Sequence, residues 1–236
     1  MQMINIRLKF VKGPETKYIS HLDLVRTFQR ALRRAHVPMV YSQGFNPHPE
    51  MSFASALGIG VTSLGEYLDI GVNENISTEE IISRLNNTMP AGLQIEKAVI
   101  LKEKAKSAMA LVSHARYTIH LCFDNSIDID SSLASFLEQD SIPAMKEQPK
   151  KNFQLIEIDI RPMIKELKLL SQEGSKVVLD CLLYCGSKAN LKPELLLQAL
   201  GKHMKETFEI EKIERVELYT DVTGKITSLL FIDNAG

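Results

Sequence analysis

The sequence Ile-Asn-Ile-Arg-Leu-Lys-Phe-Val at residues 4–11 alternates apolar and polar side chains. This period of two predicts a β-strand with one buried face. A helix is expected to begin after it, because the hydroxyl of Ser20 can accept a hydrogen bond from the backbone amide of Asp23 in a capping box. Apolar residues then recur at helical spacing to about His36, and Pro38 ends the helix. The fold therefore starts with a strand followed by an amphipathic helix.

The remaining elements of the first half are two strands, a helix and a last strand, expected at residues 39–41, 66–72, 77–89 and 93–101. This order of elements is the ferredoxin-like split pattern. The second half can be read in the same way, with strands at 115–123, 153–160, 176–184 and 210–219 and helices at 129–137 and 193–203. We therefore predict an α+β protein with two ferredoxin-like (βαββαβ) halves in tandem, residues 1–103 and 104–236.

The charge of the chain is unevenly distributed. The 236 residues are 44% hydrophobic and 24% charged, which is typical of a packed globular protein, and their net charge is −1. Residues 1–49 nevertheless contain eight Lys or Arg and only two Asp or Glu. Such a basic region can attract phosphates even in a nearly neutral protein. The alternative is a solvated basic face that acidic residues fold back onto and neutralise.

The basic residues of the first helix adjoin a loop rich in proline. Arginine can hold a phosphate with two hydrogen bonds, and aromatic side chains in a loop can stack on bases. The loop 42–49 contains two X-Pro pairs, which keep the residue before each proline extended. No known RNA-binding signature is present, and the helix could instead be solvated and paired with Glu66, Asp69 or other acids. The candidate nucleic-acid or partner-binding residues are Arg26, Arg30, Arg33, Arg34, Tyr41, Gln43, Phe45, Asn46 and His48.

Two histidines are candidates for acid–base chemistry. His21 lies in the first turn of the helix, where the dipole disfavours a protonated ring, and His48 lies in the loop. The alternative is that Asp23 only caps the helix and His48 only orders the loop. We predict no metal site and no cofactor, because no third ligand is placed by spacing and the three cysteines lack a metal-binding pattern. The cysteine spacing of a radical-SAM cluster is likewise missing from the sequence.

The N-terminal sequence reads as a strand and lacks the features of a signal peptide. No stretch approaches the ~18 apolar residues of a membrane span. We therefore expect a cytoplasmic protein without a membrane segment.

Several runs of the sequence form a recognisable pattern, which is sharpest in Tyr18–Arg26, Arg30–Ala35, Tyr41–Pro49 and Ser52–Ala54 and continues through Glu66, Asp69, Asp159–Pro162 and Arg215. This pattern resembles a known bacterial family, the radical-SAM-linked proteins. Members of that family are encoded beside a radical-SAM protein or fused to it. The resemblance therefore implies a radical-SAM protein as partner, but it implies no activity for this chain.

These observations lead to one expected function and two alternatives. The first is an accessory subunit that binds RNA, such as tRNA or rRNA, and presents it to a radical-SAM enzyme. One alternative is a protein–protein adaptor without RNA contact. The other is an RNA-processing or RNA-modifying enzyme that uses His21 or His48, an idea supported only by analogy of fold. Whether the chain is an enzyme is left open, and a non-catalytic partner is favoured.

Overall fold

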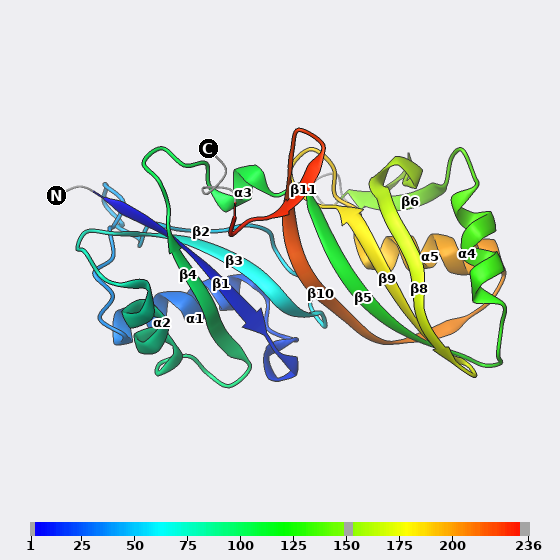
Figure 1. Cartoon of the computed structure of the whole chain (residues 1–236), viewed down its shortest axis with the longest axis horizontal. Coiled ribbons are helices and arrows are strands. Elements are labelled where there is room, and N and C mark those ends of the chain that lie inside the picture. Colours follow the sequence, from blue (N-terminus) through cyan, green and yellow to red (C-terminus); the bar gives the residue numbers. More distant parts are fainter. Residues whose placement is uncertain (1–2, 149–152, 232–236) are drawn as a thin grey trace. The chain divides into compact units, whose positions relative to one another are not determined.

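The computed structural model describes residues 3–148 and 153–231 and divides the chain into two compact units (Figure 1). Unit 1 consists of Met1–Ser113 and Arg215–Gly236, and unit 2 consists of His114–Glu214. The expected boundary lay between residues 103 and 104, and the expectation did not include the return of the C-terminal segment to unit 1. The fold is of the mixed α and β class.

Unit 1 is built on a sheet with two helices against one face. Its elements are β1 (Ile4–Lys12), α1 (His21–Arg34), β2 (Met51–Phe53), β3 (Thr62–Val72), α2 (Thr78–Asn86), β4 (Leu93–Ile100), α3 (Ala108–Leu111), β11 (Lys225–Ser228) and residues 215–222 of β10 (Phe208–Val222). Strand β1 lies between β4 and β3 and is antiparallel to both, and β3 also pairs with β2 and β10. The described residues thus show the predicted order of strand, helix, strand, strand, helix and strand.

The core of unit 1 follows from the two periodicities read in the sequence. Ile6, Leu8 and Phe10 lie on one face of β1 and are fully buried, and the apolar side of α1 packs on them. The rings of Phe10 and Phe28 are 4.8 Å apart between centroids and tilted by 60°. Full burial of each such side chain contributes about 1.5–3 kcal/mol. This packing holds α1 against the sheet and leaves its polar side in solvent.

Buried charged residues tie together the strands of unit 1. Arg7 of β1 donates two hydrogen bonds to Asp69 of β3, with distances of 2.8 and 3.0 Å. Arg215 of β10 donates two to Glu66 of β3, at 2.7 and 2.5 Å. Both arginine side chains are 1% exposed. Because a buried charge is costly unless it is paired, these pairs specify which strands are neighbours.

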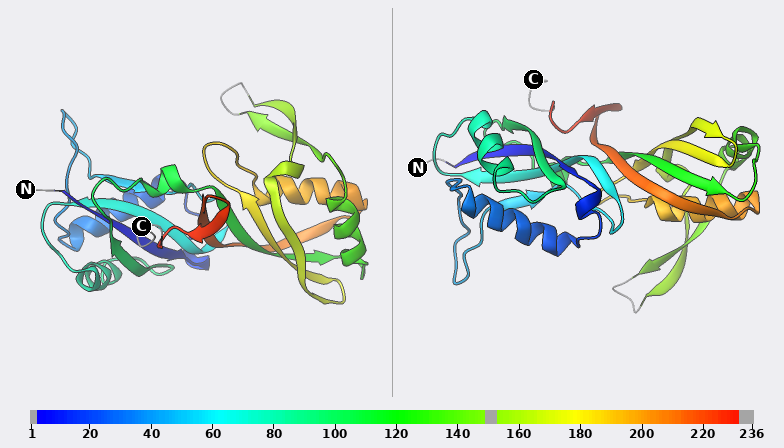
Figure 2. Two further views of the ribbon diagram at one scale, coloured as in Figure 1. Left: turned by 45° about the horizontal axis from the view of Figure 1, so that its top comes forward. Right: turned by 90° about the horizontal axis from the view of Figure 1, so that it is seen from below.

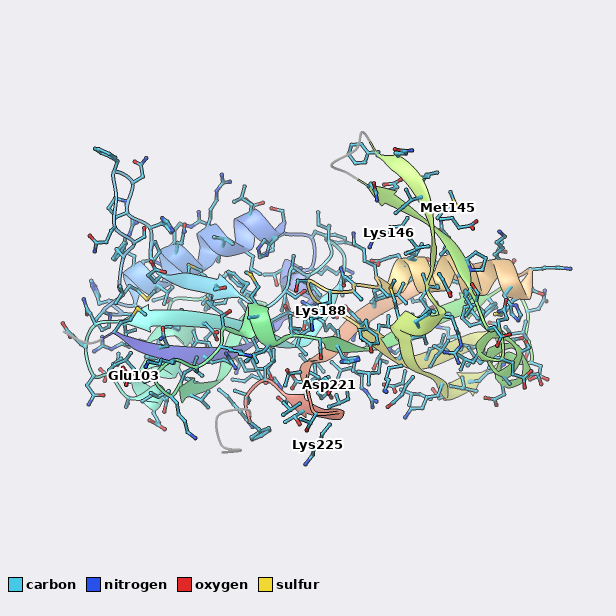
Figure 3. The ribbon with its side chains drawn as sticks, turned by 90° about the horizontal axis from the view of Figure 1, so that it is seen from above. Glu103, Met145, Lys146, Lys188, Asp221 and Lys225 are labelled. Carbon is cyan, nitrogen blue, oxygen red and sulfur yellow. The ribbon has the colours of Figure 1, made fainter. Side chains whose placement is uncertain are left out.

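Unit 2 has a sheet, two helices and a separate hairpin. Its elements are β5 (His114–Phe123), α4 (Ile129–Leu137), β6 (Pro143–Gln148), β7 (Gln154–Asp159), β8 (Ile164–Glu173), β9 (Lys176–Tyr184), α5 (Pro193–Met204) and residues 208–214 of β10. The strand order is β10-β5-β9-β8, and β6 and β7 pair only with each other among the described residues. Figure 2 shows this hairpin projecting from unit 2, and Figure 3 labels Met145 and Lys146 on β6.

The structure corrects several of the expected elements. The segment 39–41 makes only isolated bridges, from Met39 to Val72 and from Tyr41 to Pro49, and the strand beside β3 is β2. The segment 153–160 belongs to the β6–β7 hairpin, while β8, which pairs with β9, was not predicted. Local alternation of apolar and polar residues shows that a segment is extended, but it does not determine which strand the segment pairs with. The ferredoxin-like interpretation of the two halves therefore stays a prediction.

Within the residues that the structure describes, no helix has both the length and the apolar character needed to cross a lipid bilayer.

Candidate nucleic-acid interface

The four candidate arginines lie on one side of α1. At 100° per residue, Arg26, Arg30, Arg33 and Arg34 fall within an arc of about 100° on the helix surface. All four are exposed, and the opposite side of the helix is buried in the core. The helix begins at the predicted cap, where the Ser20 side chain accepts a hydrogen bond from the amide of Asp23 at 3.1 Å. Core packing and capping together fix the direction in which the arginines point.

The arginines differ in how far they are neutralised. Arg26 lies 3.5 Å from a carboxylate oxygen of Asp23, and Arg34 donates to the carbonyl of Thr88 at 2.6 Å. Among the described residues, the guanidinium group of Arg30 donates only to the hydroxyl of Thr27, at 3.3 Å. The guanidinium group of Arg33 makes no hydrogen bond or ion pair with any residue that the structure describes. Arg30 and Arg33 are therefore the guanidinium groups most available to an anion.

Asp23 is an acidic residue of α1 itself. The hydrogen bond from the Ser20 hydroxyl, and then the positive charges of Arg26 and Arg30, lower the pKa of the Asp23 carboxyl below its usual value. Asp23 is therefore ionised at neutral pH and partly neutralises Arg26. Its position in the first helical turn leaves the last two turns of α1 basic.

The two acids that could have neutralised the helix are engaged elsewhere. Glu66 pairs with Arg215 and Asp69 pairs with Arg7, so neither reaches the arginines of α1. Asp69 also accepts a hydrogen bond from the amide of Ala108 at 2.7 Å. The structure therefore excludes Glu66 and Asp69 as partners of the basic helix, and the acid that does pair with it is Asp23, through Arg26.

The loop after α1 is closed at its base by a small set of contacts. Tyr41 and Pro49 form an antiparallel bridge, and the amide of Ser42 donates to the carbonyl of His48 at 2.9 Å. The Ser42 hydroxyl accepts from the His48 amide at 3.1 Å and lies 2.9 Å from Nδ1 of the His48 ring. Below this closure, Glu50 and Val40 bond to each other, and both also bond to Gly71 of β3. The loop is thus attached to the sheet of unit 1.

The tip of the loop carries exposed side chains. Phe45 is 106% exposed and Tyr41 is 44% exposed. Gln43 and Asn46 are also exposed, and their side-chain amides make no hydrogen bond within the described part of the chain. Figures 2 and 3 show that the loop extends from the sheet on the same side as α1 and reaches beyond it. The structure therefore places the predicted helix and loop residues on one side of unit 1.

The two histidines occupy separate places. The exposed ring of His21 packs edge-on against Phe53, with 5.3 Å between centroids, whereas His48 bonds to Ser42. No contact in the described residues joins the two histidines. The described ranges 3–148 and 153–231 also contain no group of three or more His, Cys, Asp or Glu able to hold a metal ion. These contacts give His21 a packing role and His48 a role in closing the loop.

An aromatic residue outside the predicted site is exposed at the other end of α1. Tyr18 precedes the helix and is 72% exposed, and the ammonium group of Lys17 lies 5.0 Å from the centroid of its ring. Leu22 in the first helical turn is 56% exposed. In the sequence, this surface was indicated by Leu22, an apolar residue that does not lie on the apolar side of the helix. Together they extend the exposed surface of α1 toward its N-terminus.

Comparisons with known proteins identify the family and the fold. The family model described as "Uncharacterized protein conserved in bacteria (DUF2344)" matches residues 5–193, so the chain belongs to this family. None of the curated proteins matches the sequence. No comparison connects the chain with radical-SAM proteins, and that partnership stays a prediction.

Solved structures resemble the chain in fold. A chain in "Crystal Structure of a Cbf5-Nop10-Gar1 Complex" matches with a TM-score of 0.51 and 10% identity, over 91% of this chain and 48% of that one. A chain in "Structure of H/ACA RNP bound to a substrate RNA containing 2'-deoxyuridine" matches with a TM-score of 0.48 and 11% identity, over 91% and 47%. This chain thus spans about half the length of the two chains that it matches. At such identity the first match establishes a shared fold alone.

Proposed function

Since the chain belongs to a bacterial family whose description names no activity, we propose a function from its surface: the protein binds RNA through the arginine side of α1 and presents it to an RNA-modifying enzyme. The observation that carries this proposal is that the guanidinium groups of Arg30 and Arg33 are exposed and form no ion pair with an acidic residue among those described. Guanidinium groups in this state are suited to phosphate, which they can bind with two hydrogen bonds.

The resemblance to radical-SAM-linked proteins supports a radical-SAM enzyme as the recipient of the RNA. This chain would supply the binding surface and its partner the chemistry. The proposal does not extend to catalysis by His21 or His48, because the contacts of both rings are accounted for by packing and by loop closure.

The test is fluorescence anisotropy of the purified protein with labelled tRNA and with a labelled unpaired RNA at several salt concentrations. Binding through phosphates weakens steeply with salt. The logarithm of the association constant falls against the logarithm of the salt concentration with a slope of about −0.7 for each phosphate contact on a single strand. The variant Arg30→Gln/Arg33→Gln removes two charges while it retains helix propensity. We expect it to bind at least about tenfold more weakly and to reduce the slope by about 1–2.

A matched control removes two positive charges elsewhere. Lys188 lies between β9 and α5 and is labelled in Figure 3, and Lys202 lies near the end of α5. Both are exposed residues of unit 2. Lys188→Gln/Lys202→Gln changes the net charge by the same amount and should leave the dissociation constant unchanged. Equal losses in the two double variants would show that only overall charge matters, and absence of RNA binding at low salt would leave the protein–protein adaptor as the function.

A further inference from the structure

The loop 41–50 carries an aromatic side chain that the fold itself does not use. We infer that Phe45 stacks on an unpaired base, so that the RNA is recognised as a single strand. This inference rests on the proposed RNA binding and adds the class of RNA that the site selects. Aromatic side chains in single-strand-binding proteins stack on bases in this way, and every base presents a face for stacking.

The exposure of Phe45 is the first observation behind the inference. At 106% exposure its ring is as accessible as in an extended peptide, whereas the exposed phenylalanines at positions 153 and 231 are 65% and 56% accessible. Burial of such a side chain would stabilise the fold, and here that stabilisation is missing. Phe45 therefore contributes nothing to the core and is free to contact a ligand.

The loop is built to hold this ring away from the sheet. The bridge between Tyr41 and Pro49 and the three contacts between Ser42 and His48 close the base of the loop. Gly44 has a φ of +134°, a conformation that residues with a side chain rarely adopt, and it precedes Phe45 at the turn. A closed base restricts the loop before binding, which lowers the entropy lost when a base stacks on the ring.

The neighbours of Phe45 favour a base over an apolar pocket of a protein. The side chains of Gln43 and Asn46 are exposed, and their amide groups can donate to and accept from base edges. Apolar anchors of protein interfaces are instead surrounded by contacts that exclude water, which a loop tip of Gln, Gly and Asn does not provide. The arginines of α1, on the same side of unit 1, would hold the phosphates of the same strand.

The experiment compares Phe45→Ala with the unaltered protein on a labelled single-stranded RNA decamer and on the same decamer paired with its complement. Phe45→Ala should bind the single strand about 5- to 140-fold more weakly, which corresponds to 1–3 kcal/mol for one stacked base. Binding to the duplex should change little. Phe45→Trp should restore binding to the single strand, since its ring also stacks, and Phe153→Ala is the matched control.

A decamer with one 2-aminopurine reports stacking directly, because its fluorescence is quenched when the base stacks on an aromatic ring. Quenching by the unaltered protein and by Phe45→Trp, but not by Phe45→Ala, would support the inference. If Arg30→Gln/Arg33→Gln weakens binding while Phe45→Ala binds single strand and duplex as the unaltered protein does, stacking is refuted and the proposed function stands. If the unaltered protein binds neither RNA at low salt, both are refuted.

Discussion

The buried pair between Glu66 and Arg215 makes a demanding test of how unit 1 is held together. The guanidinium group of Arg215 on β10 donates two hydrogen bonds to the carboxylate of Glu66 on β3, and the two side chains are 1% and 3% exposed. Replacement of Glu66 by alanine would leave a buried positive charge without this partner. The cost of removing one member of a buried ion pair is about 3–5 kcal/mol, a large part of the 5–15 kcal/mol that stabilises a typical protein.

The double variant Glu66→Leu/Arg215→Met separates two causes of instability. One is the desolvation cost of an unpaired buried charge, and the other is the loss of the hydrogen bonds between Glu66 and Arg215. Replacement of both members by apolar residues removes the buried charge together with the attraction, so we expect the free energy of unfolding to recover to within about 1–2 kcal/mol of the unaltered protein. The control is Glu80→Ala, which breaks the exposed pair between Glu80 and Arg84 on α2. That exposed pair is expected to contribute about 0.5 kcal/mol or less.

Unfolding in urea should be followed by far-ultraviolet circular dichroism, because the chain contains no tryptophan. Since two units can unfold separately, hydrogen exchange must show which one is affected. Glu66→Ala should reduce protection in β1 and β3 and leave β9 protected. A loss below about 1 kcal/mol, or a double variant as unstable as the single one, would refute the reasoning.

Two further predictions concern single side chains. Tyr67→Phe should lower the free energy of unfolding by about 1–3 kcal/mol in urea titration, because the hydroxyl donates to the partly buried carboxylate of Glu217 at 2.6 Å. Asp128 caps α4, and hydrogen bonds from the hydroxyl and then the amide of Ser131 lower its pKa below the usual 3.8. A lowered folded-state pKa stabilises the protein above pH 3.8, and this stabilisation is lost as the pH falls through the folded value. Asp128→Ala should therefore be less stable than the unaltered protein at pH 7 in thermal denaturation, with the difference shrinking below pH 4.

Local sequence was sufficient for the elements that position the candidate site. The alternation in residues 4–11 and the helical spacing after Ser20 predicted β1 and α1, and Ser20 caps α1 as expected. The polarity of α1 likewise followed from the sequence, because a helix that buries its apolar residues must expose the remaining ones. Proline and glycine spacing was enough to place a loop at residues 42–49. These features depend on contacts within a few residues along the chain.

Only the tertiary structure decided which charged residues meet and which stay available. The partners of Glu66 and Asp69 lie 149 and 62 residues away, and no local pattern selects Arg215 and Arg7 over the arginines of α1. The same holds for β8 and the β6–β7 hairpin, which alternation could not assign to a neighbour. The sequence by itself therefore determined the elements and the basic character of α1. The long-range pairing of strands determined that Arg30 and Arg33 remain exposed, because it places the competing carboxylates in the interior of unit 1.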